Sequence, residues 1–294
     1  MSLETEPDAV NSAGVHAKYK KVFYGVDPEV ESQCFFDLWW AGSNTPLVIF
    51  IHGGGFQVGH RWEIYDDPAI PRFLQAGVSF ATIDYRYHND TASPRGVRDS
   101  LCDCKRALQF MRSNATEYDI DKTRIGAYGG SGGGGASLWL AFHDNMADSY
   151  NKDPVLREST RLKVVGAKVT QASYDILRWP EILGKELNAV EYRLLKRRAM
   201  TMLRIYTEDD LHSAEGVAIR QDLDFLRLMS KEDPPMYVSN NMEKTLDDDV
   251  HHPLHVKALW EQATKVGLVV SACARPIGLN SPCEDLVDFF LQHL

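Results

Sequence analysis

The sequence predicts an α/β protein with a mostly parallel sheet of eight strands, helices on both faces of the sheet, and a helical insertion. Short runs rich in β-branched and aromatic residues alternate with stretches of helical periodicity, as in sheets whose parallel strands are joined by helices. One of these runs, 47–51, is entirely apolar, which is typical of a strand buried on both faces, and 78–84 is predicted to be another such strand. A long charged segment that interrupts the alternation predicts the insertion.

The elements follow in order along the chain. The first two strands are expected to be antiparallel, and apolar residues at helical spacing predict a helix over 94–114. The segment from about 174 to 231 is helix-rich and charged, so we expect it to form a cap over the carboxyl edge of the sheet. Residues 1–18 are expected to be a tail, and 19–294 a single domain with this cap inserted. The predicted strands are 21–25, 34–40, 47–51, 78–84, 124–128, 163–170, 235–239 and 268–272, with further helices around 136–140, 253–266 and 283–291.

The composition excludes several classes of function. Of the 294 residues, 44% are hydrophobic and 25% are charged, as in soluble globular proteins. The net charge of -9 argues against nucleic acid or an anionic membrane as the main partner. No apolar run approaches the length of a membrane span, and the acidic start lacks the features of a signal peptide, so we expect a cytoplasmic protein with no membrane partner. The five cysteines have no spacing that predicts a disulfide framework, and a homodimer is left open.

A glycine cluster lies between the predicted strand 124–128 and the helix that follows it. Its sequence, Gly129-Gly130-Ser131-Gly132-Gly133, matches the G-x-S-x-G pattern of a nucleophile elbow. In such an elbow, the glycines permit a tight turn that lifts the serine above the sheet. No Gly-Lys-Ser/Thr follows, which argues against a phosphate-binding loop, and no cofactor is expected.

A second motif follows the strand 47–51 directly. The segment 52–56 reads His-Gly-Gly-Gly-Phe and matches the HGGG loop of lipases and esterases. The N–H groups of Gly53 and Gly54, together with that of Gly132, are expected to form an oxyanion hole. His52 is expected to orient this loop and not to act as a base.

Together these residues resemble the hormone-sensitive-lipase-like branch of the α/β-hydrolase superfamily, and within it the acetyl xylan and feruloyl esterase-like proteins. The resemblance runs from about residue 19 to the C-terminus. It rests on segments 50–56, 84–86, 120–126 and 233–235, besides the elbow. It implies an α/β-hydrolase fold and a carboxylic ester hydrolase that uses Ser131 as nucleophile.

The resemblance also implies an acid and a base. The family's acid follows the seventh strand, and counting back from the next helix places it at Asp248, with Asp247 and Asp249 as alternatives. The family's histidine follows the eighth strand, where this chain has Ile277. The candidate substitutes are His251 and His252, but a histidine so close to the acid in sequence is expected to be poorly placed to bridge acid and serine.

The same loop suggests one alternative chemistry. Its residue types suit a metal, but their spacing matches no defined motif, so no metal is expected. The residues of that alternative are Asp247, Asp248, His251 and His255.

Two functions remain after these steps. The first is hydrolysis of small acyl or acetyl esters, impaired by the absence of the usual base. The second is a non-catalytic protein that binds a small ligand in the retained pocket, as plant gibberellin receptors do without the triad histidine. The groups within hydrogen-bond reach of Ser131 distinguish the two.

Overall fold

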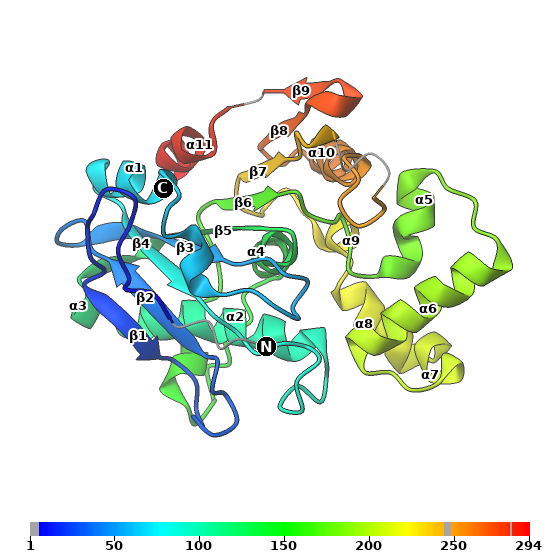
Figure 1. Cartoon of the computed structure of the whole chain (residues 1–294), viewed down its shortest axis with the longest axis horizontal. Helices are drawn as coiled ribbons and strands as arrows, with labels where there is room; N and C mark the ends of the chain where they lie inside the picture. The colour runs from blue at the N-terminus through cyan, green and yellow to red at the C-terminus, as the bar shows by residue number, and fades with distance from the viewer. Residues whose placement is uncertain (1–5, 244–247, 283) are drawn as a thin grey trace.

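The computed structural model describes residues 6–243, 248–282 and 284–294. In them, nine strands form one sheet with the order β1-β2-β4-β3-β5-β6-β7-β8-β9 (Figure 1). Strands β3 to β8 are parallel, whereas β2 pairs antiparallel with both β1 and β4. The predicted mostly parallel sheet is therefore confirmed. The strands are β1 (Tyr19–Phe23), β2 (Phe35–Trp39), β3 (Thr45–Ile51), β4 (Ser79–Ile83), β5 (Ile120–Gly130), β6 (Val165–Lys168), β7 (Met236–Ser239), β8 (Val270–Ala274) and β9 (Leu279–Ser281).

The ninth strand is one more than the sequence predicted. It follows a single 3-10 turn, Arg275–Ile277, after which Gly278 adopts a φ of 74° and reverses the chain. Strand β9 then pairs antiparallel with β8. The segment that carries the histidine in the resembled family is thus a hairpin here.

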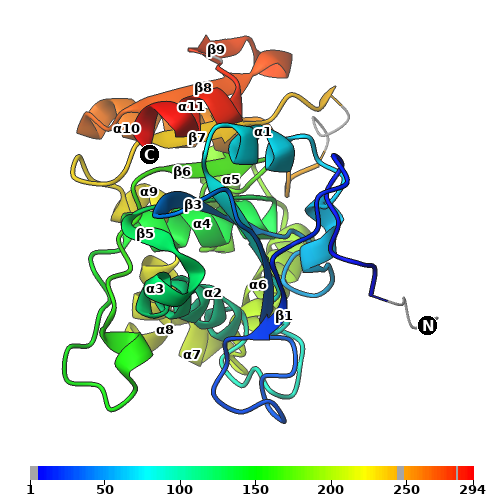
Figure 2. The same ribbon diagram turned by 90° about the vertical axis from the view of Figure 1, so that its left-hand side faces the viewer.

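Helices cover both faces of the sheet (Figures 1 and 2). On one face, α1 (Ala69–Gln75) and α11 (Leu286–His293) pack on β-strand residues such as Phe80 and Tyr128. On the other face lie α2 (Val97–Ser113), α3 (Ala115–Tyr118), α4 (Gly132–Phe142) and α10 (Leu254–Val266). No helix in the described part of the chain is long and apolar enough to cross a membrane.

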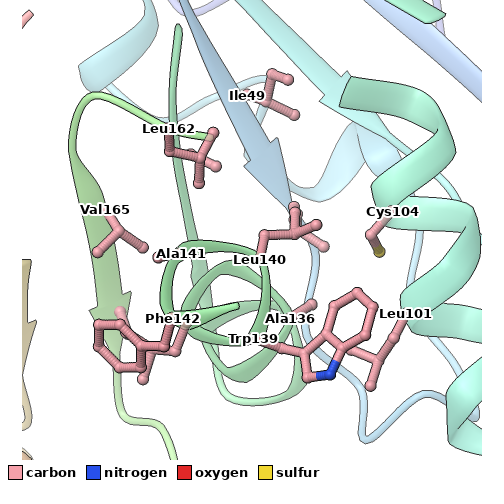
Figure 3. Close-up of a cluster of buried hydrophobic side chains, with 14 of the residues drawn as sticks. Ile49, Leu101, Cys104, Ala136, Trp139, Leu140, Ala141, Phe142, Leu162 and Val165 are labelled. Atoms are coloured by element: carbon pink, nitrogen blue, oxygen red, sulfur yellow. The ribbon is translucent and has the colours of Figure 1, made fainter. Parts of the chain in front are cut away.

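Helix α4 is the centre of the larger core. All of its residues are buried, which is the pattern of a helix surrounded by protein. Figure 3 shows Leu140 and Trp139 between the sheet and the α2 residues Leu101 and Cys104. Because α4 follows Ser131 directly, this packing fixes the position of the predicted nucleophile.

The segment between β6 and β7 is helical, as expected. Figure 1 shows α5 to α8 as a lobe beside the sheet. A hydrogen bond attaches the lobe to the rest of the chain, with His143 Nε2 2.9 Å from Asp222 Oδ1, and an ion pair between Arg220 and Asp175 lies within the segment. The helices are α5 (Trp179–Leu183), α6 (Ala189–Leu203), α7 (Glu208–His212), α8 (Ala214–Asp222) and α9 (Phe225–Leu228).

The N-terminal segment packs against the domain. Ala9 and Ala17 are buried in the core beneath α1 and α11, and Glu6 forms an ion pair with Arg61. The Arg61 side chain is itself buried, with Nε 2.6 Å from Asp37 and Nη1 2.6 Å from Asp84. Since Arg61 follows the HGGG loop and Asp84 follows β4, these ion pairs help to fix the loop against the sheet.

The cysteines differ from one another. Cys273 in β8 is disulfide-bonded, whereas Cys34, Cys102 and Cys104 are free thiols. The chain thus contains a disulfide that the cysteine spacing does not predict.

Candidate active site

Ser131 occupies a strained turn between β5 and α4. Its φ of 49° and ψ of −117° lie where residues other than glycine are rarely found, a conformation that costs about 1–3 kcal/mol. The turn is held by hydrogen bonds from Ser131 N–H to the Lys168 carbonyl, 2.9 Å, and from Gly135 N–H to the Ser131 carbonyl, 3.0 Å. A Cβ atom at Gly133 would lie 1.9 Å from the Ile51 carbonyl oxygen, so only glycine permits α4 to approach β3 this closely. These are the features of a nucleophile elbow.

Two side chains from the loop after β7 extend the Ser131 hydroxyl into a hydrogen-bonded chain. The Nε2 atom of His251 lies 2.9 Å from Ser131 Oγ, and its Nδ1 atom lies 2.8 Å from Asp248 Oδ2. A single histidine therefore bridges the serine and the acid. The expectation that His251 is too close to Asp248 in sequence to do this is wrong.

The shape of the loop explains how this arrangement is reached. The Val250 N–H donates to Asp248 Oδ1 at 2.9 Å, which turns the chain back within three residues. Two amides then hold the turn in place: Gln171 Nε2 donates to the Val250 carbonyl at 2.8 Å, and Asn240 Nδ2 donates to the His251 carbonyl. The turn places the His251 ring between Asp248 and the elbow.

The charge of Asp248 fits this geometry. Partial burial would raise its pKa, but hydrogen bonds from the His251 ring and the Val250 N–H outweigh burial and lower the pKa below its ordinary value. Asp248 is therefore a carboxylate at neutral pH. A carboxylate facing Nδ1 favours the tautomer with the proton on Nδ1, which leaves Nε2 free to accept the Ser131 proton.

Asp249 and His252 of the same loop have other partners. Asp249 pairs with Lys185, and Asp247 lies outside the described residues. His252 Nδ1 accepts the Leu254 N–H at 3.1 Å, where α10 begins.

The metal alternative gains no support from the described residues. His255 is buried, with Nε2 2.9 Å from the Asp249 carbonyl and Nδ1 3.3 Å from the Ala172 nitrogen. No group of three or more histidine, cysteine, aspartate or glutamate side chains suited to a metal occurs in the described ranges, which omit Asp247.

Ile277 lies away from this arrangement. It belongs to the 3-10 turn between β8 and β9 and borders a hollow beside Leu254 and Trp260 of α10. Ser131 is not among the residues that line that hollow. The residue after β8 therefore does not share a hollow with Ser131 in this chain.

The glycine loop after β3 lies beside the elbow. The Gly54 carbonyl accepts the N–H groups of Gln57 and Val58, and a Cβ atom at Gly54 would lie 2.0 Å from the Val58 carbonyl oxygen. A Cβ atom at Gly53 would lie 3.6 Å from that of Ser131. No hydrogen bond within the described residues uses the N–H of Gly53, Gly54 or Gly132. These donors are therefore available to a ligand, and the neighbouring Gly55, which was not singled out from the sequence, lines the cavity with Ser131.

His52 supports the glycine loop from below. Its ring is fully buried, stacks on Tyr85 at 4.2 Å between centroids, and places Nδ1 2.9 Å from the Gly53 carbonyl. Burial lowers the pKa of His52 to about 3, so the ring is neutral near pH 7. These contacts are those of a residue that orients the loop.

Buried neutral histidines should make the stability of the fold depend on pH. Burial lowers the pKa of His52 to about 3 and that of His255 to about 4, from an ordinary value near 6.5. Below pH 6.5 the unfolded chain binds protons at these histidines that the folded chain excludes. Their contribution to the free energy of unfolding is therefore fully present above pH 6.5 and is lost as the pH falls towards 4. The expected loss is about 1.4 kcal/mol per pH unit for each histidine. Urea unfolding between pH 7 and 4 measures it.

The matched comparison is His52→Gln, which should reduce this slope by about 1.4 kcal/mol per pH unit whatever its effect on stability at pH 7. An unchanged slope would mean that His52 is protonated in the folded state.

Within the described part of the chain, two hollows border Ser131. The first, about 240 Å³, lies between the elbow, the glycine loop and helices α5 and α6, and we call it the cap-side cavity. The second, about 360 Å³, is lined by Ser131, Gly53 and residues near the ends of β5 and β6. Ser131 is thus shared by the linings of both hollows. The cap-side cavity is lined by Gly55, Phe56, Gln57, His88, Ser131, Gly132, Gln171, Tyr174, Ile176, Trp179, Arg198, Thr201, Met202 and Val250.

Sequence reasoning did not select the side chains that position the loop and the elbow. Gln171 and Asn240 hold the turn of His251, and Tyr174 Oη donates to the Gly132 carbonyl at 2.7 Å. Each follows the end of β6 or β7. A polar residue just past the carboxyl end of a parallel strand is the signal that could have identified them.

The fold is shared with solved carbohydrate esterases. A truncated carbohydrate esterase from gut microbiota superposes with a TM-score of 0.70 at 17% identity, covering 94% of this chain and 95% of that one. An acetyl ester-xyloside bifunctional hydrolase from Caldicellulosiruptor lactoaceticus gives a TM-score of 0.61 at 21% identity, covering 88% and 85%. At these identities the likeness shows the fold alone.

Curated relatives match over part of their length. Gut esterase 1 of Caenorhabditis elegans is 29% identical over 149 residues, which are 47% of this chain and 25% of that protein. The arylesterase of Saccharolobus solfataricus is 32% identical over 118 residues, 39% and 36% of the two chains. The matched segments thus cover about a quarter to a third of these relatives.

The family itself is identified by a match that covers more of the chain. The sequence profile of the BD-FAE family matches residues 40–205, more than half of the chain, and includes both the glycine loop and the elbow. The chain therefore belongs to the BD-FAE family of α/β-hydrolase esterases.

Proposed function

We propose that this protein hydrolyses carboxylic esters, with Ser131 as nucleophile, His251 as general base and Asp248 as the acid that orients it. The observation that carries the proposal is the hydrogen-bonded chain from Ser131 Oγ through His251 to Asp248, with distances of 2.9 and 2.8 Å. The alternative of a protein that only binds a ligand rested on the lack of a base. The position of His251 beside Ser131 supports a base in this chain.

The reaction follows from these positions. Ser131 Oγ attacks the ester carbonyl carbon while His251 Nε2 takes the hydroxyl proton, and the Asp248 carboxylate stabilises the resulting imidazolium. The N–H groups of Gly53, Gly54 and Gly132 hold the negative oxygen of the tetrahedral intermediate. His251 then donates its proton to the leaving alkoxide, and an acyl ester remains on Ser131. Water, deprotonated by His251, attacks that ester by the same route and releases the acid.

The two hollows favour small substrates. A cavity of about 240 Å³ whose surface is mainly apolar suits a short acyl chain or a single ring. The family and the names of the relatives, which include an arylesterase and carbohydrate esterases, agree with small acyl or acetyl esters.

Labelling with a fluorophosphonate tests the proposal directly, because such reagents phosphonylate an activated serine and leave ordinary serines unmodified. The expected result is one adduct located at Ser131 by peptide mass analysis, hydrolysis of p-nitrophenyl acetate by the unlabelled protein, and loss of both in Ser131→Ala. A folded protein that neither labels nor turns over esters would instead favour the ligand-binding alternative.

A further inference from the structure

Arg198 is the one charged side chain among the described residues that line the cap-side cavity. It lies on α6, and its guanidinium carbon is 5.1 Å from the centre of the Trp179 ring. No hydrogen bond or ion pair within the described residues involves Arg198. The cavity thus contains a cation whose hydrogen-bond donors have no protein acceptor.

The two described carboxylates that act on Arg198 already have partners. Asp248 and Asp249 are close enough to influence the pKa of Arg198, but Asp248 accepts from His251 and Asp249 pairs with Lys185. Other basic residues of the cap are paired directly, as Arg178 is with Asp224 and Arg220 with Asp175. Arg198 differs from them in that it faces the nucleophile's cavity without an anion.

The surroundings of Arg198 suit a planar anion. A guanidinium stacked on an aromatic ring keeps the donors along its edge free, and two of them match the oxygens of one carboxylate. Thr201, three residues along the same helix, also lines the cavity. His88 lines it too, is 4% exposed and has no partner for Nδ1 among the described residues. Burial lowers the pKa of His88, so Arg198 is the charged side chain that a ligand meets among the described residues of this cavity.

We propose that Arg198 binds a carboxylate carried by the substrate, so that the preferred substrates are esters with an anionic group on the part that lies in the cap-side cavity. This inference rests on the proposed ester hydrolysis at Ser131. Arg198 is exposed to solvent, so beside a neutral ester its guanidinium keeps water as its partner, whereas a carboxylate gives it a charge-assisted pair of hydrogen bonds. The net charge of -9 repels anions from the protein surface as a whole. The positive charge of Arg198 offsets this repulsion inside the cavity.

Matched esters that differ in one charge test the proposal. Monoethyl glutarate against ethyl valerate places the charge on the acyl side, and 4-acetoxybenzoate against phenyl acetate places it on the alcohol side. The measured quantity is the ratio of kcat/KM for the anionic ester to that for its neutral partner. In at least one pair, Arg198→Gln should lower this ratio about 10- to 100-fold, mainly through KM, and Arg198→Lys should restore part of it.

Arg197 supplies the control. It is the next residue on α6 and lines a different hollow, so Arg197→Gln makes the same change in net charge without altering the cap-side cavity. Its charge ratio should equal that of the unmodified protein. Equal ratios in Arg198→Gln and Arg197→Gln, or a wild-type preference for the neutral member of both pairs, would overturn the inference while leaving ester hydrolysis intact.

A binding measurement separates this inference from the proposed function. Ser131→Ala retains the cavity but lacks the nucleophile, so calorimetry with 4-acetoxybenzoate and monoethyl glutarate detects the anion site without turnover. At least one of them should bind to this variant, and binding should be lost when Arg198→Gln is added. Full hydrolysis by Ser131→Ala would instead refute the proposed function, whatever Arg198 does.

Discussion

Replacing His251 by alanine should lower kcat for p-nitrophenyl acetate by about 10⁴- to 10⁶-fold, the scale on which serine hydrolases depend on their base. The Nε2 atom of His251 is 2.9 Å from Ser131 Oγ, and without it nothing takes the hydroxyl proton during attack. Steady-state kinetics with the fluorophosphonate-titrated protein measures the loss. The residual activity should come from the oxyanion hole and binding alone.

Two control variants separate the role of His251 from those of its neighbours. His252→Ala should have little effect, because His252 accepts a hydrogen bond from the Leu254 N–H at the start of α10. Ile277→His should produce no gain, since Ile277 lies beside α10 and not at Ser131. If Ile277→His raised activity by orders of magnitude, or His251→Ala retained it, the base would have to come from the segment after β8.

The sequence predicted most of the fold because the signals for it are local. The apolar run of β3 and the helical stripe of α2 each identify their element without reference to the rest of the chain. The glycine runs at 53–55 and 132–135 likewise predict a tight loop and an elbow, since few other structures require so many consecutive glycines. What was missed depends on contacts between distant residues. Strand β9 exists because Gly278 reverses the chain so that Leu279 can pair with Ala274 of β8, and three residues are too short for a periodic signal.

The placement of His251 was missed for a related reason. Three residues separate it from Asp248, and a spacing of three brings side chains together only when the backbone turns between them. That turn is stabilised by Val250 N–H and by the amides of Gln171 and Asn240, which come from the ends of β6 and β7. The sequence contains these residues, but no local pattern in it predicts that they contact one another.

The proposed acid and base lie on one short loop. In the resembled family the two residues come from different loops, so each is positioned separately. Here one turn positions both, and the hydrogen bonds from Gln171 and Asn240 to its carbonyls orient Asp248 and His251 together. A change that displaces the turn should therefore move both side chains away from Ser131 at the same time.

Asp248→Asn isolates the charge of the acid from the shape of this turn. It should lower kcat about 10³- to 10⁴-fold, because a neutral amide no longer stabilises the His251 imidazolium and its N–H₂ group can fix the tautomer with the proton on Nε2. The amide oxygen can still accept the Val250 N–H, so the thermal midpoint should change little.

Asp249→Asn is the matched variant, since it removes the same charge from the next residue. Asp249 pairs with Lys185 and does not contact His251, so its loss should leave most of the activity. Equal losses in the two variants would mean that the charge of the loop matters and that contact with His251 does not. A loss of activity in Asp248→Asn but not in Asp249→Asn would mean that catalysis depends on the carboxylate 2.8 Å from His251 Nδ1. The acid and the base would then come from the same loop.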